Sequence, residues 1–214
     1  MEAMNMPDVP AWTIIVPVKP AAVGKSRLTD VGVEREALAR AIALDTVTAA
    51  AAAAGVARVI VVTDDAGVRA ELRRARKVEI VPEGDTRGLD AAIALGAAAA
   101  GVATARAALL GDLPALRPAD LDAALELAAS VERGVVPDAE TTGSTLVTAR
   151  AGAVWVSAFG EDSAARHRLL GCTDLAVERA SSLRRDVDTA EQLSQAVALG
   201  VGPRTSAVLA SAAA

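Results

Sequence analysis

The chain has 214 residues and a formal net charge of -5, and hydrophobic residues make up 52% of it, aromatic residues only 1%. This length allows one sizeable core, and the acidic balance, without a basic stripe among aromatic residues, excludes a nucleic-acid-binding protein. The apolar runs are alanine-rich and too short to cross a membrane, and the single cysteine, Cys172, excludes an internal disulfide and favours the reducing cytoplasm.

Buried-strand patterns alternate with helical patterns over the first 131 residues. Continuous apolar runs are typical of strands that are buried on both faces of a parallel sheet. We therefore predict an α/β fold of three layers (α/β/α), with helices on both faces of a mostly parallel sheet. The predicted strands are residues 13–18, 58–63, 77–82, 107–110 and 135–138; the predicted helices are residues 34–54, 66–74, 89–102, 118–131, 164–170, 189–199 and 203–213.

We expect one domain over residues 12–204. Residues 1–11 are expected to form a disordered tail, and residues 205–214 a loosely held C-terminal segment.

Four positions are predicted as helix ends. Gly55 suits the C-terminal end of the helix over 34–54, whereas Asp65 and Ser163 suit N-caps. Asp188 and Glu191 have the spacing of a capping box, and an aspartate can both cap a helix and bind a metal through different oxygens.

Asp112 directly follows a buried strand and Gly111, and Pro114 prevents the strand from continuing. In an open parallel sheet the carboxyl ends of the strands face the ligand crevice, where an aspartate is well placed to hold a divalent metal. The alternative is that Asp112 only caps a turn or a helix start.

The loop after the first strand carries Lys19, Lys25 and Arg27 around Gly24. Only three of the 22 basic residues of the chain are lysines, and two of them lie in this loop, which favours a site that wraps a polyphosphate. A Walker A motif would need glycine where Lys19 stands, so this is not a P-loop. The alternative is a solvated basic turn.

The sequence offers no nucleophile constellation. His167, the only histidine, has no partner at metal-ligand spacing and is expected to be structural. Neither Cys172 nor any Gly-x-Ser-x-Gly pattern supports a hydrolase.

Five motifs together resemble one family. They are the basic loop, Leu-Gly-Asp-Leu-Pro at 110–114, Gly-Ser-Thr-Leu at 143–146, Phe-Gly-x-x-Ser-x-x-x-His at 159–167 and Asp-Val-Asp-Thr at 186–189. The chain resembles the phosphoenolpyruvate or 2-phospho-L-lactate guanylyltransferases from about residue 13 to residue 204. These have a Rossmann-like, MobA-like nucleotidyltransferase fold and make the activated precursor of coenzyme F(420).

The resemblance implies roles for individual residues. Asp112 and Asp188 match the carboxylates that hold Mg²⁺, and Lys19, Lys25 and Arg27 match the triphosphate-binding loop; these five are the implied catalytic residues. Gly160 and Ser163, together with Ser144 or Thr145, match the residues that bind the phosphorylated acid. The implied GTP contacts are Pro17, Val18, Lys19, Gly24, Lys25, Gly88, Leu89, Asp90 and Gly111.

One position departs from the family pattern. The family usually has Gly-Leu-Asn where this chain has Gly88-Leu89-Asp90. If this position contacts the base, an aspartate still accepts hydrogen bonds from the ring N–H and the amino group of guanine, so guanine selectivity is expected to survive.

The resemblance implies transfer of GMP from GTP to phosphoenolpyruvate with release of pyrophosphate, which gives enolpyruvoyl-diphospho-5'-guanosine. Alternatives are the same reaction on 2-phospholactate, another MobA-like nucleotidyltransferase with a different acceptor, and a protein that only binds. A transient contact with the next transferase of the pathway and a homodimer are left open.

Overall fold

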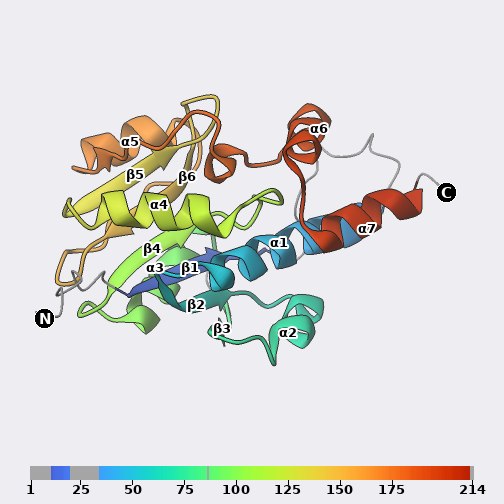
Figure 1. Cartoon of the computed structure of the whole chain (residues 1–214). Helices are drawn as coiled ribbons and strands as arrows, with labels where there is room; N and C mark the ends of the chain where they lie inside the picture. The colour runs from blue at the N-terminus through green and yellow to red at the C-terminus, as the bar shows by residue number, and fades with distance from the viewer. Residues whose placement is uncertain (1–10, 20–33, 86, 213–214) are drawn as a thin grey trace, which may run out of the picture.

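The computed structural model describes residues 11–19, 34–85 and 87–212, and it has the predicted α/β architecture (Figure 1). The strands are β1 Trp12–Pro17, β2 Val56–Val62, β3 Val78–Val81, β4 Ala105–Leu109, β5 Arg133–Pro137, β6 Ser144–Ala149 and β7 Thr173–Asp174. The helices are α1 Arg35–Ala52, α2 Ala66–Leu72, α3 Leu89–Ala100, α4 Pro118–Ala128, α5 Ser163–Leu169, α6 Ala190–Leu199 and α7 Pro203–Ala212, with a 3-10 turn, η1, at Ser182–Arg184.

One seven-stranded sheet has the order β3-β2-β1-β4-β6-β5-β7. Six of its strands run in one direction, and β6 runs antiparallel to both of its neighbours, β4 and β5. The prediction of a mostly parallel sheet is therefore confirmed. Because β6 is reversed, its first residue lies at the same edge of the sheet as the last residues of β1 and β4.

Alternate residues of β1 face the two helical layers, because successive side chains of a strand point to opposite faces. Ile14 and Val16 pack in the core under α1 and α4, whereas Ile15 packs against α3. All six residues of β1 are buried. At Gly96 of α3 any Cβ would collide with Ile15, so the helix lies unusually close to the sheet there.

The end of α1 differs from the prediction. The helix ends at Ala52 and its C-cap is Ala53, so Gly55 is not the capping glycine. The carboxylate of Asp122, on α4, instead accepts hydrogen bonds from the backbone N–H groups of Ala54 (2.9 Å) and Gly55 (2.8 Å). A side chain from another helix thus binds the chain where a local turn was expected. At α2 the prediction is confirmed, because the N-cap is Asp65.

Helix α7 packs along α1 at the C-terminal end of the described chain (Figure 1). Its first turn is held by Asp45 of α1, whose two carboxylate oxygens accept from the backbone N–H groups of Arg204 (3.2 Å) and Thr205 (2.8 Å). Asp45 is buried, and no side chain fits at Gly202 beside it. None of the described helices has the length and apolar character needed to span a membrane.

We predict that Asp45→Ala lowers the free energy of unfolding by about 1 to 2 kcal/mol, because it leaves the first N–H groups of α7 without their acceptor. Urea denaturation followed by circular dichroism measures the change. Asp45→Asn keeps one acceptor oxygen and should cost less. An unchanged free energy of unfolding for Asp45→Ala would contradict the anchoring of α7 described above.

Candidate active site

The topological switch point of the sheet lies between β1 and β4. From this central pair the sheet continues through β2 on one side and through β6 on the other. In open α/β sheets, ligands bind outside the carboxyl ends of the strands at such a point. A cavity of about 930 Å³ opens there. Its lining residues are Pro17, Val18, Lys19, Ala39, Ala43, Leu89, Leu110, Gly111, Asp112, Asp138, Thr142, Gly143, Ser144, Phe159, Gly160, Glu161, Asp162, Ser163, Asp186 and Asp188.

Gly111 lets the loops after β1 and β4 approach each other. A Cβ on this residue would lie 3.1 Å from the carbonyl oxygen of Pro17 and 3.4 Å from a methyl of Val16. The absence of a side chain therefore allows Asp112 to follow β4 directly alongside β1.

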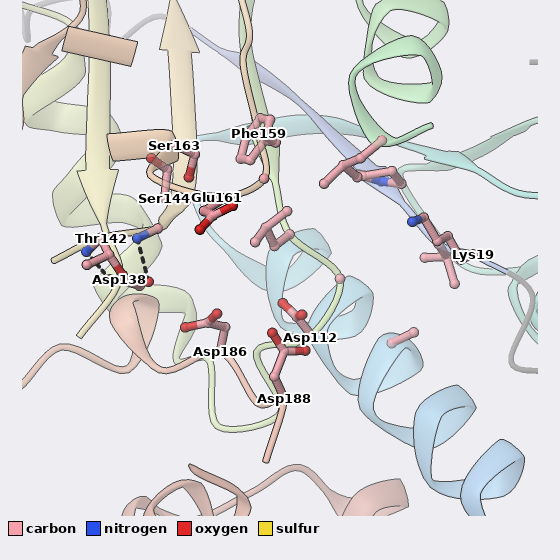
Figure 2. Close-up of a pocket in the computed structure, with 18 of the residues that line it drawn as sticks. Lys19, Asp112, Asp138, Thr142, Ser144, Phe159, Glu161, Ser163, Asp186 and Asp188 are labelled. Carbon is pink, nitrogen blue, oxygen red and sulfur yellow. Dashed lines mark hydrogen bonds between the residues drawn. The ribbon is translucent and has the colours of Figure 1, made fainter. Parts of the chain in front are cut away.

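Three carboxylates meet in the centre of the cavity. Oxygens of Asp112, Asp186 and Asp188 lie within 4.8 Å of one another. A backbone hydrogen bond of 3.0 Å, from the N–H of Val187 to the carbonyl of Asp112, joins the segment after η1 to the segment after β4. Figure 2 shows Asp186 between Asp138 and the pair formed by Asp112 and Asp188.

Asp186 was missed by the sequence analysis, although the sequence contains a signal for it. In an extended segment alternate residues face the same side. Val187 is fully buried against Leu38 and Ile42 of α1, so the residues on either side of it, Asp186 and Asp188, face the cavity. An aspartate pair that flanks one apolar residue is therefore the pattern that predicts both carboxylates.

The prediction of Asp188 and Glu191 as a capping box is wrong, and Asp112 does not cap a helix start. The helix after Asp112 is α4, and its N-cap is Arg117. The helix after Asp188 is α6, and its capping box pairs Thr189 with Gln192 rather than Asp188 with Glu191. The box lies one residue further along the chain because Thr189 Oγ1 accepts from the N–H of Gln192 (3.2 Å).

Asp186 is the carboxylate of this cluster whose ionised form is disfavoured by its surroundings. Burial, and then the neighbouring carboxylates of Asp112, Asp138 and Asp188, raise the pKa of Asp186 to about 8. Its Oδ1 is buried and accepts no hydrogen bond from any residue that the structure describes. A proton or a cation at this oxygen would offset the cost of burying it.

The carboxylate cluster fits a divalent metal ion. Carboxylate oxygens are the ligands that Mg²⁺ prefers, and Mg²⁺ is usually held by a few carboxylates together with substrate phosphates. Asp112, Asp186 and Asp188 offer such a set beside the cavity. The predicted pair, Asp112 and Asp188, is thus brought together by the fold and joined by a third carboxylate.

The cationic end of the cavity follows β1. Lys19 is exposed there, on the opposite side of the carboxylates from Asp138 (Figure 2). Pro17, Val18 and Leu89 also line this end, and Gly88 precedes Leu89 as the N-cap of α3 with a φ of 97°. The remaining residues predicted for the triphosphate loop, which are Gly24, Lys25 and Arg27, lie outside the described residues.

A tight turn between β5 and β6 forms the opposite end. The buried side chain of Asp138 accepts from the backbone N–H groups of Thr142 (3.0 Å) and Gly143 (2.7 Å). A Cβ on Gly143 would collide with this carboxylate. From the segment that carries Asp186, the guanidinium of Arg184 donates to the carbonyl of Asp138 (2.7 Å). These bonds fix the turn against the carboxylate cluster.

The loop from Phe159 to Ser163 covers the same end of the cavity. Gly160 has a φ of 110°, which favours glycine. Ser163 is buried and is the first residue of α5, whose N-cap is Asp162 in the left-handed conformation, so the prediction of Ser163 as N-cap is wrong. Because the helix begins at Ser163 itself, the Ser163 side chain does not cap it and lines the cavity instead.

The structure separates the two hydroxyl candidates. Ser144 lines the cavity, whereas Thr145 faces β5, where its Oγ1 lies 3.5 Å from the carbonyl of Val136. Behind Ser144, His167 is fully buried, and burial lowers its pKa to about 4. The imidazole is therefore neutral near pH 7 and does not line the cavity, as expected for a structural histidine.

Asp90 lies beside the cavity and does not line it. Its Oδ1 accepts a hydrogen bond of 3.0 Å from the backbone N–H of Phe159. This bond ties α3, which borders the cationic end, to the loop that covers the other end.

The family model described as "Guanylyl transferase CofC like" matches residues 12–210. The chain belongs to this family. A protein from Thermomonospora curvata named phosphoenolpyruvate guanylyltransferase is 49% identical over 203 aligned positions, and the match covers 93% of this chain and 89% of the relative. One of the same name from Streptomyces coelicolor is 48% identical and covers 93% and 96%.

Solved structures share the fold at lower identity. A nucleotidyl transferase from Methanothermobacter superposes with a TM-score of 0.56 at 18% identity and covers 86% of this chain and 95% of that one. The 4-diphosphocytidyl-2C-methyl-D-erythritol synthase of Anaerococcus prevotii gives 0.58 at 14% identity, with 89% and 98% covered. Family and fold together identify a guanylyltransferase on an α/β nucleotidyltransferase scaffold.

We predict that Asp186→Asn stabilises the metal-free protein by about 1 to 2 kcal/mol at pH 7.5, because it removes a charge that burial and the neighbouring carboxylates disfavour. The raised pKa of Asp186 means that the ionised group costs stability once the pH exceeds its ordinary value of 3.8. The gain should therefore grow as the pH rises, up to about pH 8, and vanish at about pH 4.

Urea denaturation in EDTA at several pH values measures this gain. Glu126→Gln removes the same charge from an exposed position on α4 and is the matched control, with an expected change within about 0.5 kcal/mol at every pH. A loss of stability in Asp186→Asn that does not depend on pH would show that the repulsion is not significant.

Proposed function

We propose that this protein transfers GMP from GTP to phosphoenolpyruvate and releases pyrophosphate. The observation that carries the proposal is the cluster of Asp112, Asp186 and Asp188 at the strand crossover. A cationic end lies on one side of this cluster, and an end lined by hydroxyl groups lies on the other. This arrangement suits two anionic substrates that must react with each other between them.

The choice of acceptor is supported by the relatives, which share 49% and 48% of their aligned residues with this chain and carry the name phosphoenolpyruvate guanylyltransferase. The polar side chains Ser144 and Ser163 and the loop at Gly160 line the end of the cavity away from Lys19. We assign these residues to the phosphorylated acid. We assign Pro17, Val18, Lys19, Gly88, Leu89 and Gly111 to the nucleotide, together with Gly24, Lys25 and Arg27.

The proposed chemistry needs no general base, because the attacking phosphate oxygen of the acid is already an anion. It forms a bond to the α-phosphorus of GTP while the bond to the β-phosphate breaks, and pyrophosphate leaves. The protein contributes positioning and charge neutralisation, which suffice for phosphoryl-type transfers. We assign neutralisation of the leaving pyrophosphate to Lys19, which lines the cavity. The buried, neutral state of His167 agrees with the absence of a proton-transfer step.

Asp112, Asp186 and Asp188 would hold the Mg²⁺. When bound, such an ion neutralises phosphate oxygens on both substrates and so reduces their mutual repulsion. Asp138 uses both of its oxygens to bind the turn before β6, so we assign it to support of the cavity wall.

Asp90 is better explained as a support of the loop than as a contact to guanine, because its Oδ1 already accepts from Phe159. We further propose that the product, enolpyruvoyl-diphospho-5'-guanosine, serves coenzyme F(420) biosynthesis in the cytoplasm. Transient contact with the transferase that consumes this product, and a homodimer, belong to the same proposal.

The first test is a panel of acceptors and nucleotides in a pyrophosphate-release assay with Mg²⁺, with and without the downstream transferase. We expect release with GTP and phosphoenolpyruvate and little with CTP or UTP. Release with 2-phospholactate alone would keep the reaction and change the acceptor. Silence with both acids, despite GTP binding, would contradict the proposal and indicate another acceptor.

A second test removes one metal-binding carboxylate. Asp112→Asn should lower turnover at saturating Mg²⁺ by about 100-fold or more, because its charge is needed where the two anionic substrates meet. Asp174→Asn is the matched control: Asp174 lies on the edge strand β7, is exposed and pairs with Arg168. Near-normal turnover in Asp112→Asn would overturn the assignment of the metal site.

A further inference from the structure

The buried ring of His167 connects two parts of the cavity wall. Its Nδ1 lies 3.0 Å from Oγ of Ser144, at the start of β6, and its Nε2 lies 2.9 Å from the backbone nitrogen of Ala158. Phe159 packs edge-on against the ring, with centroids 4.9 Å apart at an angle of 72°. The ring does not contact solvent, because His167 is fully buried.

The contact with Ala158 determines where the ring proton lies. A backbone N–H can only donate, so Nε2 must accept and carries no proton. A neutral imidazole has one N–H, which must then be on Nδ1. Burial lowers the pKa of His167, which keeps the ring in this neutral form near pH 7.

The position of the ring proton in turn orients the hydroxyl group of Ser144. Because Nδ1 carries the proton, it cannot accept, so the Ser144 hydroxyl cannot donate to the ring. Its Oγ accepts from Nδ1–H, and its own hydrogen must point elsewhere. No second hydrogen-bond partner of this hydroxyl occurs among the described residues, and Ser144 lines the cavity.

We propose that His167 is a positioning residue that presents the hydroxyl hydrogen of Ser144 to an anionic oxygen of the acceptor substrate. The inference rests on the proposed function only for the identity of that substrate. The histidine of the Phe-Gly-x-x-Ser-x-x-x-His motif thus acts indirectly: its ring orients the Ser144 hydroxyl and binds the backbone at Ala158, next to Phe159.

The polarity of this pair distinguishes it from a catalytic Ser–His pair. In a nucleophilic pair the ring nitrogen that faces the serine is unprotonated and takes the hydroxyl proton. Here that nitrogen is the donor, so Ser144 is a hydrogen-bond donor to the ligand and is not activated as a nucleophile. This polarity agrees with a reaction whose nucleophile is a phosphate oxygen.

The tautomer can be measured directly, because His167 is the only histidine of the chain. Long-range ¹H–¹⁵N correlation NMR on the full protein, labelled with ¹⁵N-histidine, distinguishes protonated from unprotonated ring nitrogens at pH 7.5. We expect one species with a protonated Nδ1 and an unprotonated Nε2. A protonated Nε2 would overturn the inference.

Kinetics of matched variants test the consequence for binding. We expect Ser144→Ala to raise the KM for phosphoenolpyruvate by about 10- to 100-fold and to leave the KM for GTP within about twofold, as for loss of one hydrogen bond to a charged group. Equal changes in both KM values, or none, would contradict the assigned role of Ser144.

His167→Asn and His167→Gln separate positioning from packing. The amide N–H of Asn can replace Nδ1–H toward Ser144, whereas the longer Gln places an acceptor near Ala158 and provides no donor at the Nδ1 position. We therefore expect Asn to keep the KM for phosphoenolpyruvate closer to that of the wild type than Gln does. Asn also leaves the larger cavity, so a purely structural role predicts the opposite order.

Val135→Ala is the control for stability. It opens a cavity in the core cluster that contains Phe159 and does not remove these hydrogen bonds. Its KM values should remain those of the wild type. Failure of the proposed function would appear as a silent assay with both acids, and the NMR measurement would still decide the tautomer. A protonated Nε2 with an active enzyme would instead reject this inference alone.

Discussion

The central constraint on this structure is that three carboxylates lie together in one partly buried site. Their burial and their mutual repulsion both cost free energy of folding. Asp112, Asp186 and Asp188 come from two distant parts of the chain, and their segments are joined by the backbone bond from Val187 to Asp112. Burial of Val187 beside α1 offsets part of the repulsion, since apolar contact holds the charged residues on either side in place. The core therefore supplies the free energy that keeps the charge cluster assembled, which is how a stable scaffold can carry a destabilising site.

Around the cluster, hydrogen bonds hold two segments of the cavity wall, the turn before β6 and the loop before α5. Asp138 binds the turn before β6, Arg184 binds the backbone at Asp138, and Asp90 and His167 bind two consecutive N–H groups of the loop before α5. The walls are thus preorganised, and preorganisation is the main contribution a protein makes to a transfer between two anions.

The sequence was sufficient to predict the layered fold, the strand that carries Asp112 and the family, because continuous apolar runs and short motifs are local signals. It was insufficient for the role of Asp186 and for the end of α1. Both depend on distant partners: Asp186 on the path of its segment beside α1, and the end of α1 on Asp122 of another helix. The distinction between Ser144 and Thr145 likewise required the register of β6, which no local pattern sets.

The two sets of residues assigned to the two substrates come from different parts of the chain, on either side of the central strands. The residues assigned to the nucleotide belong to the first 111 residues of the chain, and those assigned to the acid belong to residues 138–170, which enter the sheet on its other side. The two halves meet at the carboxylates, at the pairing of β4 with β6 and at the hydrogen bond from Phe159 to Asp90. Under the proposed assignment, a change of acceptor would need substitutions in one contiguous segment only, and the nucleotide half could stay the same.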